Sequence, residues 1–192
     1  MRTGRLEAFS DGVIAIVITV MVLELKAPSG VDFASLRPMI PMLLAYVLSF
    51  VYLGIYWSNH HHMLQATETV TGGILWANLH LLFWLSLVPV TTEWLDSSHA
   101  APVPTAVYGM VLLMAAIAYW LLQQCIIAMQ GSASLLREAV RTDWKGKASP
   151  LLYLLAIVSA LRSPSVSLGI YALVALMWLV PDRRIEKVLT RR

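Results

Sequence analysis

Charged residues are scarce in this chain of 192 residues, of which only 13% are Asp, Glu, Lys or Arg. A soluble domain carries about 25% charged residues and about 45–50% apolar ones, whereas 58% of this chain is hydrophobic. The composition therefore argues against an ordinary soluble enzyme and against a nucleic-acid-binding domain. Apolar stretches recur from one end to the other, which predicts an all-α membrane protein, because a helix satisfies its backbone hydrogen bonds internally in lipid.

Recognisable chemical motifs are lacking as well. The single cysteine, Cys125, lies in an apolar run and excludes an internal disulfide framework and a cysteine metal cluster. The sequence contains no Gly-rich phosphate loop, no nucleophile with a base and an orienting partner, and no Thr-Val-Gly-Tyr-Gly potassium filter. We therefore expect no enzyme activity, no cofactor and no bound metal.

Six apolar runs are the candidate membrane spans. They cover residues 9–25, 39–57, 73–92, 105–129, 149–161 and 165–180. The first four approach the ~20 residues that cross a hydrocarbon core of about 30 Å. The last two are short, so a re-entrant hairpin is the alternative, but the turn residues at 162–165 favour two tight spans. No repeat or long linker divides the chain, which predicts one six-helix transmembrane domain over residues 1–192.

The net charge of +3 follows from basic residues that six spans would place mostly on one side of the membrane. That side receives Arg2, Arg5, Arg137, Arg141, Lys145, Lys147, Arg183, Arg184, Lys187, Arg191 and Arg192. The other side receives only Lys26, Arg37 and Arg162. The positive-inside rule then predicts a multi-pass protein of the cell (inner or plasma) membrane with both termini in the cytoplasm. The polar segment 131–147 is predicted to form a short amphipathic helix on this side. The expected environment is the lipid bilayer, with no nucleic-acid partner.

Polar residues at apolar depth are informative, because each is costly unless it is paired or hydrated. Ser10 and Asp11 alone are compatible with a helix cap, but Arg5, six residues earlier, favours a buried and paired network. Asn78 opens the third predicted span, where an interhelical hydrogen bond would satisfy it.

Three consecutive histidines, His60, His61 and His62, follow Trp57 near the end of the second predicted span. Consecutive helical residues point about 100° apart, so the three rings cannot all face one metal ion. An interfacial position suits His61 and His62 better than His60. Glu24, at the outer end of the first span, could belong to an acidic ring that attracts cations.

Several motifs occur together in order along residues 5–92, and their combination resembles the transmembrane protein 175 family of lysosomal potassium channels and their bacterial relatives. The motifs are Arg5-x-x-x-Phe9-Ser10-Asp11 with Thr19, Trp57-x-x-His60, and Asn78-Leu79 with Pro89. The rest of the chain matches this family only in span count and hydropathy.

The resemblance implies a cation channel without a carbonyl-lined filter, in which the first helix lines a central pore. Animal members carry two six-helix repeats per chain, so this single repeat implies a homotetramer. By matching positions, Ile16 falls on the narrow hydrophobic constriction, Thr19 on a polar layer and Leu23 on a further apolar ring. The residues implied for a hydrogen-bonded network behind the pore helix are Arg5, Ser10, Asp11, Trp57, His60 and Asn78.

Helical spacing is compatible with this pore face but does not select it. Ile16, Thr19, Val20 and Leu23 run i, i+3, i+4, i+7 along one stripe. The span is apolar all round, so a stripe through Ile14, Ile18, Met21 and Leu25 fits the periodicity equally well.

The expected function is a moderately potassium-selective cation leak channel gated by dewetting of a hydrophobic constriction, with K⁺ as the permeant ion. The alternative is a proton-coupled membrane transporter in which Asp11 and His60 carry protons. A third reading is a non-conducting membrane scaffold whose polar residues only hold helices together.

Overall fold

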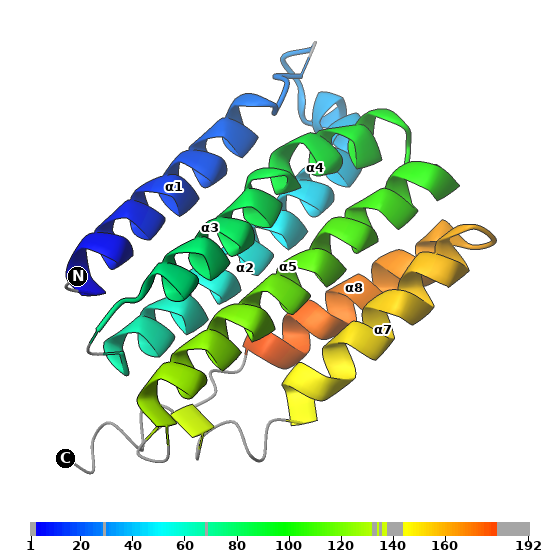
Figure 1. Ribbon diagram of the computed structural model, residues 1–192. Helices are drawn as coiled ribbons and strands as arrows, with labels where there is room; N and C mark the ends of the chain where they lie inside the picture. Colours follow the sequence, from blue (N-terminus) through cyan, green and yellow to red (C-terminus); the bar gives the residue numbers. More distant parts are fainter. Residues whose placement is uncertain are drawn as a thin grey trace.

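The computed structural model is a bundle of roughly parallel helices (Figure 1) and describes residues 3–28, 30–67, 69–131, 134, 136–137 and 144–179. The elements are α1 (Thr3–Leu23), the 3₁₀ helix η1 (Phe33–Met39), α2 (Ile40–Gln65), α3 (Gly72–Ser86), α4 (Val88–Ser97), α5 (Pro102–Gln130), α7 (Trp144–Ala160) and α8 (Pro164–Leu179). Helix α1 forms one edge of the bundle, α5 lies in the middle, and α7 and α8 form the other edge.

Four stretches of the described residues are long and apolar enough to cross a membrane. They are Thr3–Leu23, Phe33–Gln65, Gly72–Ser97 and Pro102–Gln130. Pro164–Leu179 is a shorter apolar helix, and α7 has 17 residues. The all-helical class is thus confirmed, and the four long predicted spans correspond to helical stretches of sufficient length and apolarity, while the count of six spans stays a prediction.

The third predicted span, residues 73–92, is not one continuous helix. Helix α3 ends at Ser86 and α4 begins at Val88, with Leu87 between them. Pro89 lies in the first turn of α4, where it has no N–H to donate and its ring would clash with the carbonyl four residues earlier. The proline therefore accounts for the interruption.

Other predicted boundaries also differ from the structure, most of all at the start of α1 and the end of α2. Helix α1 begins at Thr3, six residues before the predicted span, and α2 continues to Gln65, so that His60, His61 and His62 lie on the helix rather than after it. Both differences arise because hydropathy detects the apolar part of a helix and not its polar turns. Several earlier predictions lie outside the described residues. These are the basic residues Arg2, Arg141, Arg183, Arg184, Lys187, Arg191 and Arg192, the end of the last span at Val180, and most of segment 131–147.

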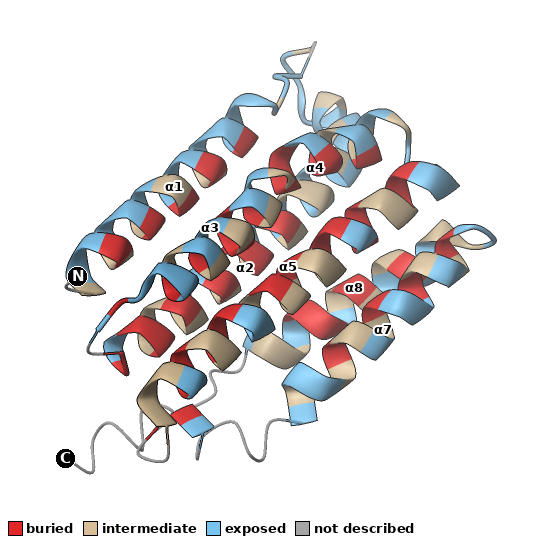
Figure 2. Ribbon diagram, in the orientation of Figure 1, coloured by how far each residue is buried: buried red, intermediate tan, exposed pale blue. Residues whose placement is uncertain are grey.

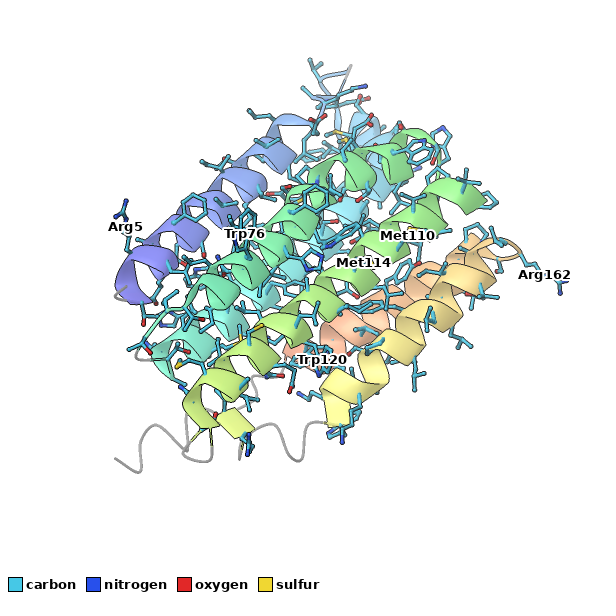
Figure 3. All side chains as sticks on the ribbon, in the orientation of Figure 1. Arg5, Trp76, Met110, Met114, Trp120 and Arg162 are labelled. Atoms are coloured by element: carbon cyan, nitrogen blue, oxygen red, sulfur yellow. The ribbon has the colours of Figure 1, made fainter. Side chains whose placement is uncertain are left out.

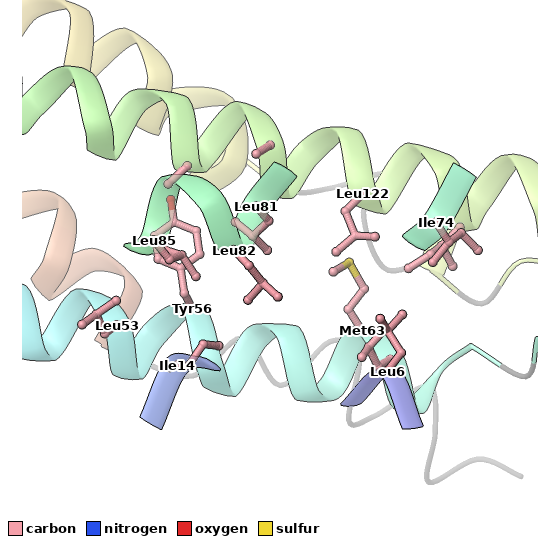
Figure 4. Packing of buried hydrophobic residues seen from close by; sticks show 14 of the residues in the cluster. Leu6, Ile14, Leu53, Tyr56, Met63, Ile74, Leu81, Leu82, Leu85 and Leu122 are labelled. Atoms are coloured by element: carbon pink, nitrogen blue, oxygen red, sulfur yellow. The ribbon is translucent and has the colours of Figure 1, made fainter. Parts of the chain in front are cut away.

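The larger of two buried apolar clusters joins α1, α2, α3 and α5. Figure 4 shows Leu6 and Ile14 of α1 against Leu53, Tyr56 and Met63 of α2, with leucines of α3 and Leu122 of α5 completing the packing. This cluster holds α1 on the bundle by one side only, as the colouring in Figure 2 makes visible.

The second cluster joins α2, α5, α7 and α8 around tyrosines. Tyr52 donates a hydrogen bond of 2.6 Å to the carbonyl of Tyr171, whose own hydroxyl donates to the carbonyl of Thr105 at 3.1 Å. Gly109 lets α8 approach α5, since a β-carbon there would collide with the Tyr171 ring. These contacts fix α8 against the centre of the bundle.

Candidate functional site: the two faces of the first helix

Helix α1 has one buried face and one exposed face, although its sequence is apolar on both. The buried face consists of Leu6, Ser10, Ile14, Val17 and Met21. Of the two neighbouring isoleucines, Ile14 is 1% exposed and Ile16 is 62% exposed. The packing thus separates the two stripes that periodicity left equivalent, because Ile14 and Met21 lie inside the chain.

The exposed face carries all four residues expected to line a pore. Ile16, Thr19, Val20 and Leu23 are each exposed in the single chain. The Thr19 hydroxyl donates to the carbonyl of Ile16 at 2.8 Å. Its only proton is therefore used within the helix, and the lone pairs of Oγ1 are left to accept a hydrogen bond or to face a cation.

Three buried polar side chains form a chain of hydrogen bonds between α1, α2 and α3. Asn78 Nδ2 donates to Ser10 Oγ at 2.9 Å, and Ser10 Oγ donates to the Leu6 carbonyl at 2.9 Å. His60 Nε2 lies 2.7 Å from Asn78 Oδ1. Ser10, His60 and Asn78 are all fully buried, so this cluster fixes the depth and rotation of α1 on its neighbours.

The tautomer of His60 follows from these partners. Asn78 Oδ1 can only accept, so His60 Nε2 must donate to it. His60 Nδ1 is buried and has no hydrogen-bond partner within the described part of the chain. This atom is the one unsatisfied polar point of the cluster.

A second, more exposed ladder also joins α1 to α2. Trp57 Nε1 donates to Asp11 Oδ1 at 3.0 Å, and His61 Nδ1 lies 2.6 Å from Glu7 Oε1. The Trp57 and His61 rings stack with their centroids 6.4 Å apart. Asp11 and Trp57 therefore lie in this ladder and not in the buried cluster.

Sequence reasoning missed Glu7 and assigned His61 to the membrane interface. A signal was present, because Glu7 and Asp11 are four residues apart on one helix while Trp57 and His61 are four apart on the other. Such matched spacings place both pairs on facing stripes of two packed helices.

Arg5 belongs to neither group of polar residues. Its side chain is exposed and points away from the bundle (Figure 3), and among the described residues it has no hydrogen-bond or ion-pair partner. Six residues of α-helix turn the direction of a side chain by about 120° from that of Asp11. The expected pairing of Arg5 with the carboxylate is therefore not made within this chain.

A groove of about 350 Å³ runs beside the exposed face of α1 and separates it from the α3–α4 junction. Its walls include Ile16 and Val20 on one side and Pro89 and Val90 on the other, and Glu24 and Glu93 also line it. The described residues contain no group of three or more His, Cys, Asp or Glu side chains placed to hold a metal ion.

Comparison with known proteins gives consistent matches. Residues 5–89 match the family model described as endosomal/lysosomal potassium channel TMEM175. A potassium channel from Chryseobacterium sp. (strain P1-3) is 56% identical over 189 residues, which is 98% of each chain. The endosomal/lysosomal proton channel TMEM175 of Rattus norvegicus is 39% identical over 82 residues, which is 34% of this chain and 16% of that protein.

Among solved structures, a lysosomal potassium-selective channel TMEM175 homolog from Chamaesiphon minutus matches with a TM-score of 0.77. It is 28% identical, and the match covers 94% of this chain and 97% of that one. The likeness therefore extends over the whole helical bundle and beyond the motifs of the first three spans.

Proposed function

This chain belongs to the TMEM175 family of potassium channels, and from that premise we propose that it is a moderately potassium-selective leak channel. The exposed faces of α1 from four copies line its pore. The observation that carries the proposal is the exposure of Ile16, Thr19, Val20 and Leu23 beside a fully buried opposite face. This face is left free by the packing of the single chain and is available to face other copies of it.

The constriction is a ring of four Ile16 side chains. Apolar side chains that meet on an axis exclude water from a narrow passage, and a dry passage blocks ions without any charged gate. A small tilt or rotation of α1 widens the ring and lets water return. The anchoring of α1 by Ser10, Asn78 and His60 sets the resting position from which this movement starts.

Selectivity arises one turn further along, where four Thr19 hydroxyls surround the passage. Because each hydroxyl proton is bound to the Ile16 carbonyl, the oxygen presents lone pairs that replace part of the water shell of a cation. This arrangement favours K⁺, which loses its water more easily than Na⁺, but four oxygens in one layer give only moderate selectivity.

The tetramer is supported by the groove between α1 and the α3–α4 junction. A groove lined by Ile16, Val20, Pro89 and Val90 offers apolar surface next to the proposed axis, where a neighbouring α1 can pack. Closed rotational symmetry is the common arrangement of identical subunits, and it brings the four exposed faces together.

We place the protein in the cell membrane with both termini in the cytoplasm. Arg137, Lys145 and Lys147 lie at the end of the bundle where α5 ends and α7 begins, whereas Arg162 lies in the turn at the opposite end. An excess of Lys and Arg marks the cytoplasmic side.

The test is potassium flux into liposomes that contain the purified protein and a potassium gradient. We expect a large passive flux, which Ile16→Asn increases while lowering the preference for K⁺ over Na⁺, because an amide hydrates the constriction. Ile16→Leu is the matched control, since it keeps an apolar side chain of similar volume and should leave flux close to wild type. Saturable flux coupled to protons would instead indicate a transporter using Asp11 and His60, and absence of flux would indicate a scaffold.

A further inference from the structure

A second cavity lies away from α1, between α2, α5, α7 and α8. Its volume is about 410 Å³, which is in the range of pockets that bind small ligands. None of its described lining residues comes from α1, α3 or α4. Two of them, Trp120 and Lys147, are exposed, so the cavity is open to the surroundings of the bundle.

The body of this cavity is apolar and aromatic. Ile55 of α2, Ile117 and Trp120 of α5 and Tyr153 of α7 are among the residues that line it. Walls of this composition favour hydrocarbon over water. A small hydrophilic solute would leave most of this surface without a suitable contact.

Two polar groups that line the cavity make no hydrogen bond within the described part of the chain. Gln123 is 6% exposed and lines the cavity, and its amide makes no hydrogen bond with the residues that the structure describes. The hydroxyl of Tyr56, another buried lining residue, also has no hydrogen bond there. Both groups face the open cavity and can bond there to water. An occupant that displaces this water must therefore offer acceptors to the amide and the hydroxyl, because leaving them unpaired would be costly.

Two other polar side chains of the same cavity already have partners in the protein. Asn59 Nδ2 donates to the Ile55 carbonyl at 3.0 Å, and Ser149 Oγ accepts from Trp178 Nε1 at 2.8 Å.

Positively charged side chains lie at the mouth of this cavity. Lys147 lines the cavity from the first turn of α7, and Lys145 Nζ lies 5.8 Å from the centre of the Trp178 ring. Among the described lining residues there is no carboxylate to neutralise Lys147. The mouth therefore attracts an anion, and basic pockets between membrane helices recognise anionic lipid headgroups.

We propose that this cavity binds one anionic phospholipid of the surrounding membrane. An acyl chain lies along Ile55, Ile117 and Trp120. The amide of Gln123 and the hydroxyl of Tyr56 donate to the ester carbonyls, and the phosphate lies at Lys147. The proposal depends on location in a membrane and is independent of channel activity.

The test is native mass spectrometry of the purified protein with phosphatidylglycerol and, separately, phosphatidylcholine carrying the same acyl chains. We expect phosphatidylglycerol to be retained about fivefold more strongly, the effect of one lysine at a membrane surface. Equal retention of the two lipids would overturn the proposal. So would displacement of phosphatidylglycerol by glycerol phosphate at equal concentration, which would indicate a site for soluble anions.

Single substitutions at the cavity test where the lipid binds. Lys147→Gln should remove the roughly fivefold preference, whereas the matched variant Arg162→Gln, which removes a positive charge at the opposite end of the bundle, should preserve it. Gln123→Leu should weaken retention of both lipids alike, because both have ester carbonyls. Equal effects of Lys147→Gln and Arg162→Gln would contradict the assignment. If Gln123→Leu does not fold, Ala116→Phe, which fills the cavity from α5, should reduce retention of both lipids, and unchanged retention would contradict the proposal.

Discussion

The two faces of α1 are similar in composition and opposite in environment. On one face, Ile14 and the Ser10 hydroxyl are enclosed by α2 and α3, while on the other Ile16 and Leu23 have no neighbour that covers them. The difference teaches that apolar character alone does not give a membrane helix its orientation. The orientation of α1 depends on a few buried polar contacts, and these leave a mostly apolar stripe, interrupted by Thr19, available to other copies of the chain.

The difference between the two faces of α1 is tested most strongly by making the same substitution on each of them. Ile14→Asn removes a buried side chain and introduces an unpaired amide, which should lower the free energy of unfolding by about 4 kcal/mol. Ile16→Asn should change it by less than about 0.5 kcal/mol, as at exposed sites in general. Denaturant or thermal unfolding in detergent measures both. Similar losses for the two variants would mean that the faces are equivalent.

The buried polar cluster is the next target. Asn78→Leu leaves His60 Nε2 without its partner and should cost about 2 kcal/mol of folding free energy. Asn59→Leu is the matched control and should cost much less, because among the described residues the Asn59 side chain bonds only within its own helix. The double variant Asn78→Leu with His60→Leu should be less destabilised than the sum of its parts, since neither partner is then left unsatisfied. If the free-energy losses of the two single variants simply add in the double variant, the hydrogen bond between His60 and Asn78 does not stabilise the fold.

The exposed ladder should contribute less than the buried cluster. Trp57→Phe removes the donor to Asp11 and keeps most of the ring, so we expect a loss of about 0.5–1 kcal/mol in thermal unfolding. Trp76→Phe should have a smaller effect, because Trp76 is exposed and its indole has no hydrogen bond within the described residues. A loss at Trp57 as large as that at Asn78 would make the ladder, rather than the buried cluster, the anchor of α1.

Much of the fold could be predicted from hydropathy, because the four long spans are nearly continuous in apolar residues. The break at Leu87 could not be predicted from hydropathy, since the chain stays apolar across it, although Pro89 carried the signal. The polar ends of α1 and α2 were underestimated for a related reason: Arg5, Glu7 and His61 interrupt the hydropathy and not the helix.

The candidate site was only partly accessible from the sequence. Ser10, His60 and Asn78 could be chosen because a polar group in lipid requires a partner, but which of them meet depends on how three helices pack. Arg5 shows the limit, because its exclusion from both polar groups follows from its angular position on α1 and not from its chemistry. The exposed stripe was undetermined by periodicity, because only tertiary contacts distinguish Ile14 from Ile16.

The most direct test of the proposed pore is whether the exposed face of α1 contacts water in the membrane-embedded protein. Thr19 on α1 and Leu155 on α7 are both exposed in the single chain, but under the proposal Thr19 lines an aqueous passage and Leu155 faces lipid. Thr19→Cys and Leu155→Cys, each on a Cys125→Ser background, are treated in liposomes with a charged, membrane-impermeant thiol reagent while potassium flux is recorded. We predict that the reagent modifies position 19 and reduces the flux, and that it leaves Leu155→Cys unmodified with unchanged flux. Modification at position 155 with none at position 19 would contradict a pore lined by α1.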